Sequence, residues 1–520
     1  MPTMHDFVES QMAAGSDPIA LPLSMSGTPD LELVETMRAQ LVADRTEVFD
    51  VAYRYFHGEH LAPYAPQSAS DQIIDLQNRS ITNWIPLLVN LPTQVSYVEG
   101  YRRGESASLS EAPTQVTGNR KRFSPEYACW QENRMDGKQA TIYHSALLYG
   151  QSFVHVNTVH PSGRIKVEVL STRNTIAFFD DPVNDIRPLL VLTIKTYARD
   201  ENTPGLAILW DDTNRYELTL NEKGEFAFIG EPIPHGASEC PVIRYTCGAP
   251  DDEGRSLGVV NATLIRLQDR VNQAAFSTNI TADFGAFKVR TAAGLQVNYK
   301  IDSATGEPLL DAAGNPVPEP IAVSQAKMLI SENPETKFGQ LDETPLGGYL
   351  SNEDQATKNL AAIAQFPLHA LIGNVSNLSA EALAALEQQF MRQMQSFQVS
   401  WGESHEELFR LLAEAMGEME GAMSYGGEVR WRDMTSKAFG AVMDGLGKAS
   451  QMLGVPSRGL WPLIPGLSSG DIADLEELAE DERNDALLND VSPAGAAARE
   501  RRPVAAVTPL GVGGNTANQA

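Results

Sequence analysis

Two amphipathic stretches separated by a proline-rich segment constrain the fold of this chain more than any other feature. In the first, residues 256–290, apolar side chains recur at steps of three and four, which lines one face of an α-helix; they are Leu257, Val260, Leu264, Leu267, Val271 and Ala274. Ser256 can cap this helix, because a serine oxygen accepts a backbone N–H of the first turn. The second stretch, 349–366, carries Leu350, Leu360 and Ile363 and ends at Pro367. The chain is therefore expected to run out along one helix and return along another.

The segment between these two helices is expected to be a small excursion without a long helix. A proline removes a backbone donor and clashes inside a helix, and six prolines occur here, at positions 308, 316, 318, 320, 334 and 345. Short strands are predicted at 287–290, 297–301 and 328–330.

The length and charge of the chain bound its organisation. A chain of 520 residues exceeds what one hydrophobic core usually serves, so about three units are expected. With 67 acidic and 40 basic side chains, the net charge is −27, and the protein lacks the basic surface that grips nucleic acid through its phosphates. The three cysteines are scattered, which favours a reducing compartment. Neither a signal peptide nor a membrane span is visible, so we expect a soluble protein made in the cytoplasm.

The remaining segments predict an α+β body followed by helices. Helical patterns cover 33–56, 83–101 and 130–149, and the first is expected to end at Gly58. Alternating apolar and polar residues between 153 and 245 then predict a mainly antiparallel unit of short strands. A long helix capped by Ser379 is expected to reach Glu420, with Gly402 as a kink point. Helices at 435–453 and 469–488 follow, before an aperiodic tail.

Three segments partly match motifs for catalysis, phosphate binding or metal binding, but each lacks residues or spacing that the motif requires. Residues 466–470 match G-x-S-x-G, but prolines precede the serine and no histidine follows it, so Ser469 is read as a helix cap. The run at 445–448 lacks the spacing and the hydroxyl residue of a phosphate loop. His57, Glu59 and His60 lack the spacing of a zinc helix. We therefore expect no enzyme activity, no cofactor and no metal, and favour an assembly or interaction protein.

The order of these elements resembles the portal proteins of tailed bacteriophages, in particular the family typified by the portal of phage SPP1. The resemblance spans about residues 33–482 and depends on degenerate motifs in a specific order. They are Tyr53 to Gly58; Asn83 to Gly100; Trp130, Asn133 and Met135; Ala146, Leu147, Tyr149 and Gly150; Gly254 and Ser256; Leu267, Gln268, Asp269 and Asn272; Phe366, Pro367, Ser379, Glu381, Ala382 and Leu383; and Gly454, Pro456, Leu463, Ile464, Pro465, Gly466, Leu467 and Ile472.

The resemblance implies a ring-forming α+β portal architecture, in which each stretch of the chain has a part. An N-terminal arm (1–32) precedes a wing of helices and antiparallel strands (33–255). Two stem helices (256–284 and 346–366) enclose a β-containing clip (285–345). A tunnel loop (367–378), a long wing helix (379–430), a helical crown (431–490) and a flexible tail (491–520) follow. Packing within the stem is expected to involve Leu257, Val260, Leu264, Leu267, Val271, Leu360 and Ile363.

The resemblance also implies a function and partners. The ring, usually of twelve copies, would occupy one capsid vertex of the virion and conduct double-stranded DNA during packaging and ejection. It would be assembled in the host cytoplasm. Its partners would be the terminase large subunit, a major capsid or scaffolding protein and a head-tail adaptor, with no membrane. In the implied tunnel loop, Gly373, Asn374, Ser376 and Asn377 would face DNA, and the loop contains no lysine or arginine.

Two other classes of protein stay open at this point. One is another structural component of a phage head, such as a capsid or adaptor protein. The other is a cytoplasmic α+β enzyme with a site that the motifs do not reveal. Electron microscopy of the purified protein would separate a ring from shells or a compact monomer.

Overall fold

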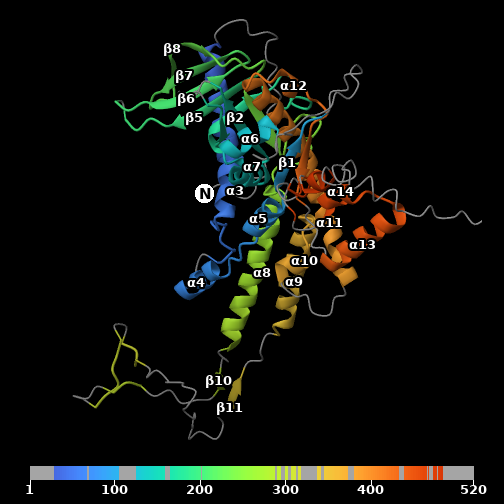
Figure 1. Cartoon of the computed structure of the whole chain (residues 1–520). Coiled ribbons are helices and arrows are strands. Elements are labelled where there is room, and N and C mark those ends of the chain that lie inside the picture. The colour runs from blue at the N-terminus through green and yellow to red at the C-terminus, as the bar shows by residue number, and fades with distance from the viewer. Residues whose placement is uncertain are drawn as a thin grey trace, which may run out of the picture.

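The computed structural model describes residues 29–66, 69–104, 124–158, 164–200, 202–286, 290–293, 299–301, 306–311, 314–317, 337–340, 345–372, 380–432, 439–464, 467, 472, 474–476 and 478–483. Within these ranges the chain mixes helices and sheets. A body of both is continued by two long helices that run side by side away from it (Figure 1).

A nearly continuous helical rod opens the described chain, as the sequence predicts. It consists of α2 (Leu31–Asp44), the π-helical turn η1 (Arg45–Phe49) and α3 (Asp50–Phe56). The Asp30 side chain accepts the N–H of Glu32 and caps the first turn. Gly58 ends the rod with a φ of 85°, a left-handed conformation that glycine adopts without steric cost, so the predicted end is confirmed.

Two predicted helices are shorter than their apolar patterns suggest. The helix expected at 83–101 is α5 (Ile85–Val95), preceded by α4 (Asp71–Arg79) and followed by β1 (Val98–Arg102), which pairs with β12 (Glu428–Trp431). The helix expected at 130–149 is divided into α6 (Pro125–Glu132) and α7 (Met135–Tyr149), because Arg134 adopts a φ of 54°. Both helical predictions were therefore wrong at one end.

Besides the β1–β12 pair, two larger antiparallel sheets form the β part of the body, and the predicted alternation is confirmed. The smaller has the order β3-β2-β9, with β2 (Gln151–Asn157), β3 (Lys166–Leu170) and β9 (Val242–Thr246). The larger is a meander of five strands: β4 (Thr175–Phe178), which follows the 3-10 turn η2 (Thr172–Asn174), β5 (Leu190–Thr196), β6 (Gly205–Trp210), β7 (Asn214–Leu220) and β8 (Phe226–Pro234).

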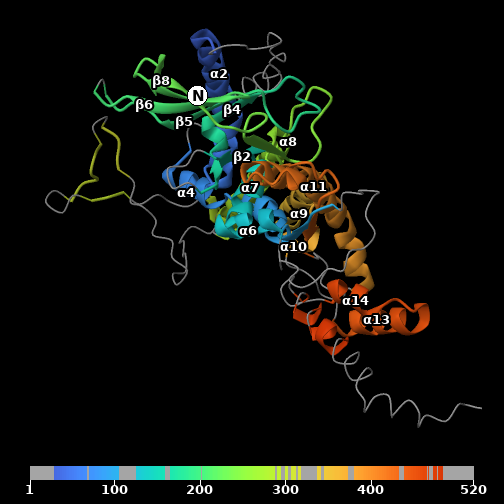
Figure 2. The ribbon, with the colours of Figure 1, turned by 45° about the horizontal axis from the view of Figure 1, so that its top comes forward.

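The meander is covered on both faces. On one face, α2 buries Val34, Met37 and Leu41 against the strands, and Figure 2 shows this helix lying across the sheet. On the other face, a cluster that includes Trp210 of the meander and Phe153 of β2 joins the two sheets. A third and larger cluster joins the smaller sheet to α5, α6, α7 and the C-terminal helices. Burial of apolar surface in these layers stabilises the body.

The C-terminal half contains the long helices. They are α8 (Ala262–Ala286), α9 (Gly347–Ile363) and α11 (Ala380–Ala415), with α10 (Leu368–Ile372) between the last two. Helix α11 passes through Gly402 without interruption and ends at Ala415, short of the predicted Glu420, and α12 (Met419–Ala422) follows it. Helix α13 (Phe439–Leu453), α14 (Ser457–Leu460) and the 3-10 turn η3 (Trp461–Leu463) follow, and α13 and α14 lie on the far side of α11 from the meander (Figure 2).

Candidate functional site

The two helices that leave the body, α8 and α9, form the candidate functional site. They run antiparallel and in contact, and the hairpin of β10 (Arg290–Ala293) and β11 (Lys337–Gln340) lies beyond their far ends (Figure 1). The excursion predicted between the helices thus contains a pair of strands. Residue 290 is the point where the predicted strand 287–290 and β10 coincide, whereas 328–330 lies outside the described residues.

The start of α8 differs from the sequence prediction. Asn261, not Ser256, caps the helix, because its Oδ1 accepts the backbone N–H groups of Thr263 and Leu264 at 3.0 and 3.1 Å. The Ser256 hydroxyl instead accepts the N–H of Cys247 at 3.0 Å. Leu257 precedes the helix and is 70% exposed. Leu257 was therefore wrongly included in the apolar face of the predicted helix.

The other residues predicted to pack in the stem are placed as follows. Four are almost fully buried: Val260, Leu264, Val271 and Leu360. Leu267 is partly buried and packs against the main core. Ile363, the last residue of α9, is 59% exposed. The buried members join both helices to one hydrophobic cluster, so the pair is a continuation of the body core.

Polar side chains of α8 bind the loops that precede and follow α4. Gln268 and Asn272 are fully buried. Gln268 accepts the N–H of Trp84 at 3.1 Å and donates to Asn272, whose Oδ1 also accepts the N–H of Thr82 at 3.1 Å. Backbone groups that would otherwise be buried without partners are thus satisfied by the helix. These contacts fix the rotation of α8 against the body.

A titratable pair extends this junction. The Tyr55 hydroxyl donates to the carboxylate of Asp269, at 2.8 Å to Oδ1 and 3.0 Å to Oδ2. Partial burial raises the pKa of Asp269 to about 6, although the hydrogen bond from Tyr55 opposes the shift. His60 stacks on the Tyr55 ring, and burial lowers its pKa. In the sequence, Gln268, Asp269 and Asn272 were singled out only because they belong to the motifs of the family resemblance. No sequence pattern indicated their hydrogen-bond partners, which lie more than 180 residues earlier.

The long helix α11 is anchored in the body by aromatic and polar contacts. His405 is fully buried between two hydroxyls, with Nε2 2.7 Å from that of Tyr143 and Nδ1 3.0 Å from that of Tyr245. Tyr143 also donates to Gln139, so all groups are satisfied when Nε2 donates to Tyr143 and Nδ1 accepts from Tyr245. Burial lowers the pKa of His405 to about 3, which keeps this ring neutral.

The residues predicted to face DNA lie outside the described part of the chain. Gly373, Asn374, Ser376 and Asn377 fall between α10 and α11, in residues 373–379. The structure describes α10, which precedes this segment, and α11, which follows it. Phe366 and Phe390, on either side of it in sequence, meet edge to face at a centroid distance of 5.5 Å.

Residues of two motifs that the sequence analysis rejected make ordinary structural contacts. Residues 445–448 lie inside α13, where Lys448 donates to Asp444 at 2.6 Å, and so form no loop. Both ring nitrogens of His60 are used, by the Tyr55 carbonyl and the Asn272 amide. Within the described ranges, no three histidine, cysteine, aspartate or glutamate side chains gather as a metal would require. No helix in these ranges has the length and hydropathy needed to span a bilayer.

Comparisons with known proteins give structural neighbours and a family. A chain from the neck of an empty GTA particle, computed with C6 symmetry, is similar over 79% of this chain and 99% of its own, with 11% identity and a TM-score of 0.39. A chain from the virion of a native gene transfer agent (GTA) particle covers 79% and 98%, with 11% identity and a TM-score of 0.36. A chain from the neck of a native GTA particle with C12 symmetry covers 79% and 95%, with 11% identity and a TM-score of 0.37. No curated protein matches.

The family result covers most of the sequence. Residues 43–486 match the model of the family described as phage portal protein, SPP1 Gp6-like, a span that includes most of the body, both projecting helices and α11. This chain therefore belongs to the SPP1-like family of phage portal proteins.

Proposed function

We propose that this protein forms a closed ring, of twelve copies, at one vertex of a virion capsid, and that double-stranded DNA passes through the ring during packaging and ejection. The observation that carries the proposal is the antiparallel pair of α8 and α9, which extends from the body to the β10–β11 hairpin (Figure 1). A ring needs two different surfaces on each subunit that close by rotation, and long projecting helices supply such surfaces. Membership of the portal family supports this reading.

In this proposal the parts of the chain keep the roles that the resemblance implies. Residues 33–255 form the wing, 256–284 and 346–366 the stem, 285–345 the clip, and 431–490 the crown. The clip docks the terminase large subunit during packaging and a head-tail adaptor afterwards. The wing or crown meets a capsid or scaffolding protein. ATP hydrolysis belongs to the separate packaging motor, and the ring is assembled in the host cytoplasm before it enters the virion.

The tunnel loop is proposed to touch DNA without gripping it. Residues 367–378 contain no lysine or arginine, and Gly373, Asn374, Ser376 and Asn377 offer neutral polar or small side chains. Each cation that neutralises a phosphate strengthens binding and releases counterions. A loop without cations therefore gives DNA few points at which its sliding is resisted.

Electron microscopy of the purified full chain tests the proposed function. We expect rings with a central channel, and native mass spectrometry should give a single closed subunit number. Ile363→Asp places a carboxylate at an apolar position of α9 that is 59% exposed and should weaken rings without unfolding the subunit, whereas Asp75→Asn, at an exposed position of α4, should keep them. A wild-type protein that stays a compact monomer, or forms icosahedral shells, would refute the proposal.

A further inference from the structure

A cavity of about 870 Å³ opens between α11, α12 and one end of the meander. Its walls come from four stretches of the chain: the loop before β5, the turn after β6, the segment after β8, and the C-terminal half of α11 with α12. The cavity lies far in sequence from the stem residues discussed above and takes no part in the contacts that hold α8. Its volume is in the range of pockets that receive a ligand or a partner side chain.

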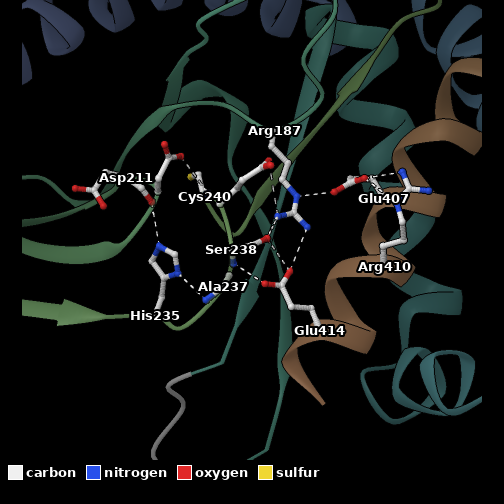
Figure 3. A network of polar contacts seen from close by, with 11 residues as sticks. Arg187, Asp211, His235, Ala237, Ser238, Cys240, Glu407, Arg410 and Glu414 are labelled. Atoms are coloured by element: carbon white, nitrogen blue, oxygen red, sulfur yellow. Dashed lines mark hydrogen bonds and ion pairs between the residues drawn. The ribbon is translucent and has the colours of Figure 1, made fainter. Parts of the chain in front are cut away.

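The two cations of the cavity are already matched by carboxylates. Figure 3 shows the Arg187 side chain, which is 9% exposed, pointing between Glu407 and Glu414 of α11. Its Nε lies 2.6 Å from Glu407 and an Nη lies 3.6 Å from Glu414. Arg410 makes two hydrogen bonds with the same Glu407 carboxylate, at 2.6 and 3.0 Å. Neither arginine is therefore a spare charge that could receive an anion.

Negative charge remains in surplus after these pairs are formed. Asp180, Asp185, Asp212 and Glu239 also line the cavity. Glu239 is 64% exposed and lies 3.9 Å from Arg187, too far for a hydrogen bond. Partial burial raises the pKa of Asp212, whereas the hydrogen bond from the Cys240 N–H and the positive charge of Arg187 lower it. The cavity is electrostatically suited to a cation from another molecule.

The rim of the cavity carries large apolar side chains that are mostly exposed, although the Arg410 guanidinium lies 5.2 Å from the centroid of the Tyr425 ring. Met419, Met423 and Tyr425 are 60%, 62% and 75% exposed, and all three line the opening. Tyrosine and methionine are enriched at protein interfaces, and adjacent exposed apolar side chains mark sites of association. An acidic cavity with an apolar rim fits a lysine or arginine side chain whose carbon stem packs on the rim.

We infer that this cavity is a contact between neighbouring copies of the chain, and that it receives an exposed arginine or lysine side chain of the next copy. The inference rests on the proposed ring. Copies that each carry a net charge of −27 repel one another, so a contact that covers surplus carboxylates is stable only if the neighbour brings a cation. Charge complementarity thus selects a basic side chain as the occupant.

Photo-crosslinking from Tyr425 tests the inference in the assembled protein. Replacing Tyr425 with p-benzoylphenylalanine keeps an aromatic ring at the rim, and rings assembled from mixed unlabelled and nitrogen-15-labelled copies identify links between subunits. We expect a mixed-isotope link from Tyr425 to a peptide with an exposed arginine or lysine. The same probe at Tyr64, which is 78% exposed on the loop before α4, is the matched control for labelling efficiency.

Charge-neutral variants give a second readout that does not need crosslinking. Asp180→Asn with Glu239→Gln removes two exposed carboxylates and leaves the Arg187 pairs with Glu407 and Glu414 in place. We expect the concentration at which rings half-dissociate to rise at least about tenfold. Asp75→Asn with Glu222→Gln, two exposed carboxylates elsewhere, should leave it unchanged.

The outcomes separate this inference from the proposed function. The inference would be overturned if the probe at Tyr425 formed links only within its own subunit. It would also be overturned if Asp180→Asn with Glu239→Gln did not change the concentration at which rings half-dissociate. Either result would leave the proposed ring standing. A link to a different protein would also overturn it. A protein that forms no rings at all would refute the proposed function first.

Discussion

Asp269 places a carboxylate in the half-buried junction between α8 and α3, with the hydroxyl of Tyr55 in α3 as its donor. Folding raises the pKa of this group from 3.8 to about 6. Between these values the folded chain holds a proton that the unfolded chain has released, so the free energy of unfolding rises as the pH falls through about 6. At neutral pH the ionised carboxylate therefore lowers stability.

Asp269→Asn should stabilise the protein at pH 7.5, and this gain should shrink at pH 5 and disappear as the pH falls below about 3.8. The asparagine oxygen can still accept the Tyr55 hydroxyl, while the desolvated charge is gone. We expect a gain of about 1 kcal/mol at pH 7.5, reduced from the full pKa shift because solvent still reaches the group. Denaturant unfolding at the two pH values measures it.

An exposed carboxylate provides the control for this substitution. Asp75 is 56% exposed and pairs with Arg79 on the surface of α4, so Asp75→Asn should change stability little at either pH. A loss of stability in Asp269→Asn that is larger at pH 7.5 than at pH 5 would contradict the assigned cause of the pKa shift.

At the scale of the elements, the periodicity of apolar residues correctly predicted segments whose backbone conformation depends on their own sequence. The meander strands and the rod of α2 and α3 agree with the predicted segments, because alternation and helical spacing each favour one backbone form. The helix predictions were wrong where pairing with a segment distant in sequence determines the backbone conformation. Val98 fits a helical face, yet it pairs with Trp431 of β12, more than 330 residues away. No local pattern contains that pairing.

The candidate site was predictable to a similar extent. The two helices follow from periodicity and prolines, whereas β10 shares only residue 290 with a predicted strand and β11 lies outside all the predicted strands. Four of the seven packing residues are almost fully buried. Leu257 has the right spacing but precedes the cap at Asn261. The polar contacts of Gln268 and Asn272 depend on the Thr82–Trp84 backbone, which only the folded chain brings to α8.

His405 links three elements, since it belongs to α11 and its partners belong to α7 and β9. His405→Phe keeps an aromatic ring but leaves the Tyr245 hydroxyl buried without its partner. We expect a loss of about 2 kcal/mol in the free energy of unfolding, because an unpaired buried hydroxyl keeps its full desolvation cost. Denaturant unfolding at pH 7.5 measures the loss.

The double variant distinguishes lost hydrogen bonding from poor packing. Adding Tyr245→Phe to His405→Phe removes the stranded hydroxyl, so the double variant should recover part of the stability that the single variant loses. A double variant less stable than His405→Phe alone would show that ring packing, not the hydroxyl, limits the site.

For the whole molecule, the net charge and the projecting helices agree with the proposed channel for DNA. The net charge is −27, the loop between α10 and α11 has no cation, and α9 has a single lysine, which pairs with Asp354. A protein that held DNA by its phosphates would need many cations along its path. The proposed channel therefore depends on its geometry, held by α8, α9 and α11, more than on attraction.

The salt dependence of DNA binding tests this view of the channel. Affinity for DNA that depends on Z phosphate contacts falls with a slope of about −0.9Z in a plot of log K against log salt concentration. We expect purified rings to bind short duplexes weakly, with a slope between zero and about −2 from 50 to 200 mM salt. Fluorescence anisotropy with labelled duplexes measures it. As a matched comparison, Asn374→Lys with Asn377→Lys should steepen the slope and tighten binding if the loop meets DNA. A steep slope in the wild-type ring would mean that it grips the duplex, and an unchanged slope in the lysine variant would remove the loop from the DNA path.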